Sequence, residues 1–260
     1  MNVARKTILV DGLPVHYEVA GEGEPLIFIH GLSESTRVWY RNVPILARHY
    51  HVYLVDLPGF GAMRGSRKQF SLDQCAIWLE RWMQVVGIET AHLVGHSMGG
   101  YVALALAALH PEKIKHLVLV SSVGIPLRCS ANHLIYPALR AIGRTTPLFW
   151  PCILYDYMRA GPAMVWQAAR QIVALEELVD LSKASVPILL IWGSEDDLVP
   201  LALGHQLHLH LTGSHLFILP GANHFCIFER PYDFTTALLA FLQDQEVGRQ
   251  AVGVPLSSQM

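Results

Sequence analysis

Charged side chains are scarce in this sequence, and the two signs are nearly balanced. Asp, Glu, Lys and Arg make up 15% of the 260 residues, with 19 basic and 21 acidic side chains and a formal net charge of −2. Proteins that hold nucleic acid or anionic lipid by electrostatics concentrate Lys and Arg in a patch or stripe. The sequence has no such stripe, so we expect neither a nucleic-acid partner nor a strongly basic membrane-binding surface.

Cysteine is scarce as well. The four cysteines, Cys75, Cys129, Cys152 and Cys226, are widely spaced and form no C-x-x-C pair. Such a pair is the usual signature of a zinc site or of a redox-active disulfide. We therefore expect four reduced, partly buried thiols, which are typical of a cytoplasmic protein.

Long hydrophobic runs are also missing. No window holds about 18 uninterrupted apolar residues, the length that a membrane-spanning helix needs. The apolar stretch after Arg5 and Lys6 is too short for a signal-peptide core, and Asp11 interrupts it. We expect a cytoplasmic protein without a transmembrane segment. Its mean hydropathy of +0.33 is nevertheless high, because hydrophobic residues make up 52% of the chain.

What the sequence does contain is an alternation of short apolar runs with helical stretches. Strands are expected at 7–10, 14–20, 25–29, 51–55, 91–95, 115–121, 186–192 and 215–219. Helices are expected at about 39–48, 71–86, 97–110 and 231–243, with Gly or Pro near several of their ends. Uninterrupted apolar runs suit strands that are buried on both faces. This alternation predicts an α/β fold with a mostly parallel, doubly wound sheet.

One long stretch breaks the alternation. Residues 126–185 contain no strand–helix–strand unit and resemble a series of short helices punctuated by Pro and Gly. We interpret this stretch as a helical cap inserted into an α/β core that comprises residues 1–125 and 186–246. Residues 247–260 include two glycines, a proline and paired serines, and we expect a flexible tail there.

The segment Gly95-His96-Ser97-Met98-Gly99 is the strongest chemical signal. A G-x-S-x-G match alone is weak, but this one follows the apolar run 91–94 and opens the helical stretch 101–109. A strand–turn–helix setting is what a nucleophile elbow needs. The turn is so tight that side chains two positions before and after the serine would clash, which accounts for Gly95 and Gly99. We expect Ser97 at the carboxyl end of the sheet, where open α/β folds bind ligands.

The chain resembles the α/β-hydrolase superfamily, in particular its serine esterases and lipases with a helical cap. The resemblance spans nearly the whole chain and rests on five segments in the family order, at 30–31, 56–61, 95–100, 192–200 and 221–224. It implies a triad of Ser97 as nucleophile, His224 as base and an orienting acid. The family pattern places the acid four positions before the proline, at Asp196. The neighbouring Asp197 and Glu195 are the alternatives.

The resemblance also implies an oxyanion hole made of backbone N–H groups. The donors would be Met98, which follows the nucleophile, and Leu32, which follows His30 and Gly31. Gly31 would let the backbone approach the substrate closely. We interpret residues 56–61 as a structural turn and expect His96 to be a packing and hydrogen-bonding residue.

The expected activity is hydrolysis of a hydrophobic carboxylic ester, a small molecule, through an acyl-enzyme. Large apolar residues crowd the expected cap, and those not needed for packing would line an acyl pocket or form a patch that contacts lipid or a partner. His205, His208, His210 and His215 have no recognised metal-ligand spacing, so we expect neither a metal nor an organic cofactor.

Cofactor-free perhydrolase and acyltransferase activities use the same triad and stay open as alternatives. Two further alternatives remain. A carbon–carbon bond hydrolase of the family, acting on an aromatic dienoate, would use the same triad. Such enzymes commonly carry Asn before the serine, whereas this chain has His96. The other alternative is a non-catalytic member of the fold that binds a small molecule or a partner. The sequence gives no signal for an oligomeric state.

Overall fold

The computed structural model describes residues 3–64, 71–127, 129–175, 183–245 and 247. Within them, eight strands form one sheet in the order β1-β2-β4-β3-β5-β6-β7-β8. Strands β3 to β8 run parallel, while β1 and β2 form an antiparallel hairpin and β2 pairs antiparallel with β4. The α/β class and the mostly parallel sheet are thereby confirmed. The strands are β1 (Ala4–Val10), β2 (Leu13–Ala20), β3 (Pro25–Ile29), β4 (His51–Val55), β5 (Ala91–His96), β6 (Ile114–Val120), β7 (Ile188–Gly193) and β8 (His215–Leu219).

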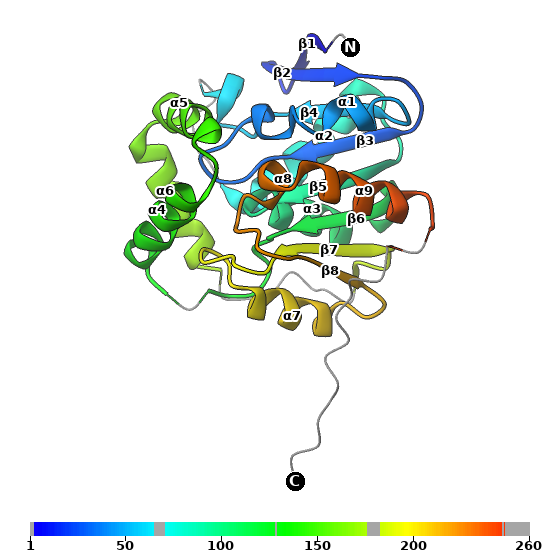
Figure 1. Cartoon of the computed structure of the whole chain (residues 1–260). Helices are drawn as coiled ribbons and strands as arrows, with labels where there is room; N and C mark the ends of the chain where they lie inside the picture. Colours follow the sequence, from blue (N-terminus) through cyan, green and yellow to red (C-terminus); the bar gives the residue numbers. More distant parts are fainter. Residues whose placement is uncertain (1–2, 65–70, 128, 176–182, 246, 248–260) are drawn as a thin grey trace.

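Helices cover both faces of the sheet (Figure 1). Leu93 and Val94 show why the central strands are continuously apolar: Leu93 packs into the core on one face and Val94 into the core on the other. The first core includes residues of α2 (Leu72–Val86), α3 (Met98–Leu109) and α7 (Leu201–His210). The second includes residues of α1 (Val43–Leu46), α8 (Cys226–Glu229) and α9 (Pro231–Leu242).

The helix expected at about 39–48 is shorter in the structure and begins later. A short 3-10 turn, η1 (Thr36–Trp39), is followed by α1, which begins after Asn42. Pro44 lies in the first turn of α1, where its missing N–H would have no intrahelical partner anyway. In the interior of one continuous helix the same proline would remove a hydrogen bond and clash with the preceding turn, so the helix starts at this point instead.

Between β6 and β7 the described residues form helices and connecting loops. The helices are η5 (Ala131–Leu134), α4 (Ile135–Arg144), η6 (Pro147–Phe149), α5 (Trp150–Ala160) and α6 (Pro162–Val173), and prolines or glycines lie at several of the breaks. In Figure 1, α4, α5 and α6 lie beside the edge of the sheet where β6 and β7 end. We call residues 131–173 the roof helices. The boundaries of a cap at 126 and 185 stay predictions.

All four cysteines are free thiols, with Cys75 and Cys226 buried and Cys129 and Cys152 half-buried. In the part of the chain that the structure describes, no helix is both long and apolar enough to cross a membrane. The tail predicted at 247–260 lies outside the described residues, apart from Val247.

Candidate active site

Ser97 occupies a strained turn between β5 and α3. Its backbone angles are φ 51° and ψ −115°, a conformation that costs a non-glycine residue about 1–3 kcal/mol. The N–H of Ser97 donates to the carbonyl oxygen of Val120 at 2.9 Å, which anchors the turn to the end of β6. A Cβ atom at Gly95 would lie 2.4 Å from the carbonyl oxygen of Gly99, and one at Gly99 would lie 2.4 Å from that of Ile29. Neither glycine position can accept a side chain without moving the backbone.

His224 and Asp196 form a buried hydrogen-bonded pair. Nδ1 of His224 lies 2.9 Å from Oδ2 of Asp196. The other carboxylate oxygen, Oδ1, accepts from the N–H groups of Leu198 and Val199 at 2.9 and 2.8 Å. An ionised carboxylate can only accept, so Nδ1 of His224 carries a proton and Nε2 is left as the basic nitrogen.

The two acidic neighbours of Asp196 contact other residues. Asp197 pairs with Arg140 and Arg144 of α4, at 3.0 and 2.9 Å. Glu195 also pairs with Arg144. Of the three candidate acids, Asp196 is therefore the one that the fold brings to His224.

The turn after β3 is built around two buried side chains, His30 and Glu34. Nδ1 of His30 donates to the carbonyl oxygen of Gly31 at 2.7 Å, and Nε2 accepts from the N–H of Leu57 at 3.0 Å. One nitrogen donates and the other accepts, so His30 is a neutral imidazole. Oε2 of Glu34 accepts from the N–H of Gly31 at 2.6 Å. These bonds hold both sides of Gly31 and thereby place Leu32, which borders the cavity described below.

Met98, the other expected oxyanion donor, is the first residue of α3 and is buried. The first N–H groups of a helix have no intrahelical acceptor and point outward from its N-terminus, where partial positive charge accumulates. The N–H of Met98 thus belongs to the positive end of this helix, directly after Ser97, and its role as an oxyanion donor stays a prediction.

Residues 56–61 form a turn whose conformation depends on Asp56. Oδ1 of Asp56 accepts from the N–H of Thr36 at 2.8 Å, and Oδ2 accepts from the N–H of Ala62 at 2.7 Å. Gly61 has φ +48°, and a Cβ there would overlap the Asp56 carboxylate. The interpretation of this segment as a structural turn agrees with these contacts.

Two histidines of α7 use a ring nitrogen locally. Nδ1 of His208 lies 2.8 Å from Oγ of Ser214, and Nδ1 of His210 lies 2.8 Å from the carbonyl oxygen of Gln206. Throughout the described ranges, no cluster of three or more His, Cys, Asp or Glu side chains is arranged to hold a metal ion.

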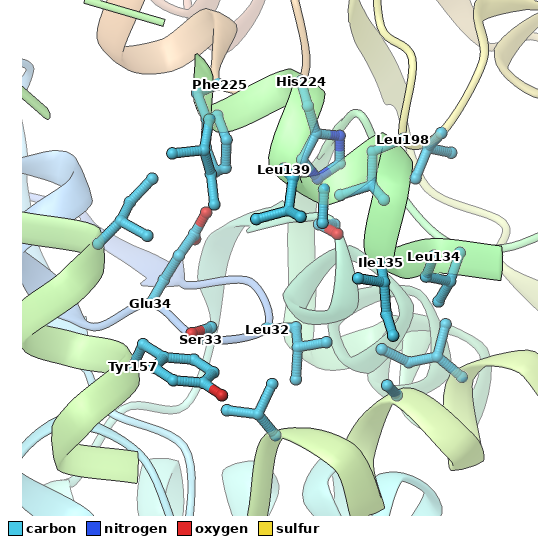
Figure 2. Close-up of a pocket in the computed structure, with 18 of the residues that line it drawn as sticks. Leu32, Ser33, Glu34, Leu134, Ile135, Leu139, Tyr157, Leu198, His224 and Phe225 are labelled. Atoms are coloured by element: carbon cyan, nitrogen blue, oxygen red, sulfur yellow. The ribbon is translucent and has the colours of Figure 1, made fainter. Parts of the chain in front are cut away.

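A cavity of about 930 Å³ lies between the ends of the strands and the roof helices. Ser97, His224 and Glu34 are among the polar residues that border it, and apolar side chains of α4, α5 and α6 form most of the rest. Figure 2 shows Leu139 and Tyr157 of the roof helices together with His224 and Glu34 around this space. The cavity thus combines a small polar region with a large apolar surface, as small-molecule sites commonly do.

Glu34 is the residue at this site that the sequence did not lead us to propose. It is 4% exposed, and its Oε2 lies 3.0 Å from Nδ1 of His96. Nε2 of His96 lies 3.0 Å from the main-chain oxygen of His224, so the hydrogen-bonding role expected for His96 is confirmed. The signal for Glu34 was a single acidic residue three positions after Gly31, close to the end of a buried strand.

Polar contacts attach the roof helices to the loops that carry the site. Asp156 of α5 accepts from Oγ of Ser35 and from Arg37, both at 2.6 Å. These two residues follow Glu34 closely in the chain. Asn223, which precedes His224, donates from Nδ2 to the carbonyl oxygen of Ala141 in α4 at 3.0 Å. A shift of the roof helices would therefore disturb both loops.

The known proteins that are similar to this chain include α/β hydrolases that cover most of its length. Residues 24–156 match a family model described as alpha/beta hydrolase fold. A 2-hydroxy-6-oxo-6-(2'-aminophenyl)hexa-2,4-dienoic acid hydrolase of Metapseudomonas resinovorans is 28% identical, over 89% of this chain and 88% of the relative. A pimeloyl-[acyl-carrier protein] methyl ester esterase of Aeromonas hydrophila subsp. hydrophila is 30% identical, over 88% of this chain and 100% of the relative.

A solved structure agrees with these sequence relatives. A membrane phospholipase A described as a bacterial virulence factor superposes with a TM-score of 0.79 at 26% identity, covering 93% of this chain and 86% of that one. The matched family model covers half of the chain, and the relatives cover nearly all of it. The chain belongs to the α/β hydrolase fold family and is a hydrolase.

Proposed function

We propose that the protein hydrolyses hydrophobic carboxylic esters whose acyl part carries no charge, through an acyl-enzyme on Ser97. Oγ of Ser97 attacks the ester carbonyl while Nε2 of His224 takes its proton, and Asp196 stabilises the resulting imidazolium. The backbone N–H groups of Leu32 and Met98 hold the oxyanion. His224 then gives the proton to the departing alcohol, and a water molecule releases the acid from Ser97 in the same two stages.

The charge of the cavity lining carries this proposal. Among the described residues that line the cavity there is no Lys and no Arg, and the carboxylate present is Glu34. The hydrolases of dienoic acids and dienedioates among the relatives act on carboxylates. Placing a carboxylate in this apolar space, where no Lys or Arg of the lining can pair with it, opposes binding through desolvation. A neutral ester, such as the methyl ester named for another relative, avoids this penalty.

A matched pair of substrates tests this proposal. We expect kcat/KM for 4-nitrophenyl hexanoate to exceed that for the 4-nitrophenyl monoester of adipic acid by about 10²-fold, since burying a carboxylate without a partner costs several kcal/mol. Ser97→Ala is the control for background hydrolysis. Equal rates for the two esters, or faster cleavage of a meta-cleavage dienoate than of either, would contradict the proposal.

A non-catalytic binding member of the fold is the alternative of a different class. An activated serine reacts with a fluorophosphonate probe, whereas an unactivated one does not. We expect wild-type protein to be labelled and Ser97→Ala to remain unlabelled. Absence of labelling in folded wild-type protein would favour the binding role.

We also propose that the roof helices contact a lipid surface, on the basis of exposed apolar side chains beside the cavity. A group of large apolar side chains lines the cavity and is also 40–64% exposed: Ile135, Leu139, Trp150, Leu154 and Trp166. Exposed apolar clusters mark interaction sites, and Trp is favoured where lipid meets water. The substrate would then enter the cavity from the lipid phase, and the expected cytoplasmic location would place that surface on the inner side of a membrane.

A further inference from the structure

His96 presents both of its ring nitrogens to hydrogen-bond acceptors. The ring lies at the end of β5, directly before Ser97, and is fully buried. Nε2 is 3.0 Å from the main-chain oxygen of His224, which has no proton to give, so Nε2 must carry one. Nδ1 is 3.0 Å from Oε2 of Glu34. One proton lies between these two atoms, and its position decides whether the pair is charged.

The surroundings of Glu34 favour the charged form. Oε2 also accepts from the N–H of Gly31 at 2.6 Å, a bond that is stronger to a carboxylate than to a carboxylic acid. Burial has the largest influence on the pKa of Glu34 and by itself would raise it. The positive charge and hydrogen bond of His96, together with the Gly31 N–H, outweigh burial and hold this pKa below its usual range.

The same balance applies to His96. Burial is again the largest influence and by itself would lower the pKa of His96. The charge of Glu34, its hydrogen bond and the carbonyl of His224 outweigh it and raise the pKa above its usual range, with a smaller contribution from Asp196. His30, the other histidine beside Glu34, uses its ring nitrogens on the backbone groups of Gly31 and Leu57, so the hydrogen bonds to Oε2 of Glu34 come from His96 and Gly31.

We infer that Glu34 and His96 form a buried carboxylate–imidazolium pair that positions the two halves of the site relative to each other. On one side the pair holds Gly31, whose peptide group leads to Leu32. On the other side it holds the main chain of His224. The inference rests on the proposed hydrolysis at Ser97 for its catalytic consequence, since a displacement of about 1 Å in such a site can cost on the order of 10²-fold in rate.

The pair also balances charge beside the oxyanion hole. Glu34 borders the cavity in which negative charge develops on the substrate oxygen. An unpaired carboxylate there would oppose that charge, and its effect would be strong because the site is shielded from water. The imidazolium of His96 removes this opposition. His96 and Glu34 are thus positioning residues that do not themselves exchange protons with the substrate.

A spectroscopic measurement tests the charge without reference to activity. In protein labelled with ¹⁵N-histidine, we expect both ring nitrogens of His96 to have the chemical shifts of a protonated imidazolium at pH 7 and above. The signal is identified by its loss in His96→Asn or, if that variant fails to fold, by contacts of the ring with Trp39 and Phe225. A His96 ring with one unprotonated nitrogen at pH 7 would overturn the inference.

A double-mutant cycle tests the positioning role. In His96→Asn the Glu34 carboxylate loses its partner, and we expect kcat to fall on the order of 10²-fold with a much smaller change in KM. Adding Glu34→Gln removes the unpaired charge, so the double variant should recover about tenfold of that loss. Additive losses in the cycle would show that the two side chains act separately, which contradicts a coupled pair.

The chain offers a matched control in an exposed histidine–glutamate pair. Nδ1 of His110 lies 3.3 Å from Oε1 of Glu112, with both side chains largely in solvent. His110→Asn and Glu112→Gln should leave kcat unchanged, because exposed pairs contribute little.

If Ser97→Ala kept full ester turnover, the proposed function would fail. The imidazolium signal of His96 would be unaffected by that result, so the two failures can be told apart.

Discussion

The two sides of the cavity differ in how their side chains are held. On the sheet side, Asp196, His224, Glu34 and His96 are buried and joined by hydrogen bonds to one another or to backbone groups. On the roof side, the helices present mainly apolar side chains, and several of these are exposed to solvent. Directional bonds fix the positions of reacting groups, whereas apolar contacts accept a range of shapes. The sheet side is thus suited to chemistry and the roof side to the choice of substrate.

Removal of the nucleophile on the sheet side of the cavity should have the largest effect on activity. Ser97→Ala should lower kcat for a neutral nitrophenyl ester on the order of 10⁶-fold, because triad residues act as a unit. Ser130→Ala, at an exposed serine of the chain, is the control and should retain wild-type turnover. Steady-state kinetics on both variants, with unfolding curves to verify folding, decides the outcome. Turnover within tenfold of wild type in Ser97→Ala would move the chemistry to another residue.

A second comparison uses the two adjacent aspartates. Asp196→Asn should lower kcat by about 10⁴-fold, since an amide no longer stabilises the imidazolium of His224 or fixes its tautomer. Asp197→Asn should change kcat less than tenfold, because Asp197 pairs with Arg140 and Arg144 on the protein surface. The two variants differ by one position and carry the same chemical change. Equal losses would contradict the assignment of Asp196.

The Glu34–His96 pair should leave a signature in the pH dependence of stability. The folded-state pKa of His96 is raised, so the contribution of His96 to the free energy of unfolding is lost as pH rises through that pKa. The folded-state pKa of Glu34 is lowered, so the contribution of Glu34 is lost as pH falls through its pKa. At a pH between the folded-state pKa values of Glu34 and His96, Glu34→Gln should lower the free energy of unfolding by about 3–5 kcal/mol. Denaturant unfolding of both proteins across this range measures the difference. A difference that stays constant with pH would argue against a charged pair.

The smallest expected effect tests the roof side. Leu154 and Met158 lie one helical turn apart on α5 and are both exposed, but of the two Leu154 also lines the cavity. Leu154→Ser should raise KM for a hexanoyl ester about tenfold with little change in kcat, because apolar contact with the acyl chain is lost. Met158→Ser should leave KM near the wild-type value. Equal changes in both variants would mean that Leu154 acts at the surface and not in the cavity.

The same two variants test contact with lipid. Wild-type protein should sediment with phosphatidylcholine vesicles, and both Leu154→Ser and Met158→Ser should weaken this binding through the loss of apolar surface. Absence of vesicle binding by the wild type would remove lipid contact from the proposed function and leave the ester hydrolysis untouched.

Much of the fold was predictable because the information is local. Strands β3, β4 and β8 lie at the residues expected for them, since an apolar run between turn-forming residues leaves little choice of structure. The short helix α1 was less predictable. Its start depends on where Pro44 falls within a helical turn, and composition alone does not show this.

The site was predictable in part. The pattern around Ser97 implies its strained turn, because the flanking glycines have no other evident reason to be there. The family spacing before Pro200 favoured Asp196, with Asp197 kept as an alternative. The contacts of Asp197 with Arg140 and Arg144, which lie more than 50 positions away in the chain, are visible only in the structure. Glu34 was missed because it lies in the loop after β3, whereas its partner His96 lies 62 positions later at the end of β5.

The sequence by itself determined the order of strands and helices along the chain, the nucleophile turn and the low overall content of charged residues. Each of these follows from neighbours in the chain or from composition. Only the tertiary structure decided which residues line the cavity and that His96 has an acceptor at each nitrogen. Hydrogen bonding and burial depend on groups that are remote in sequence, and the packing of separate loops at one end of the sheet is what brings them together.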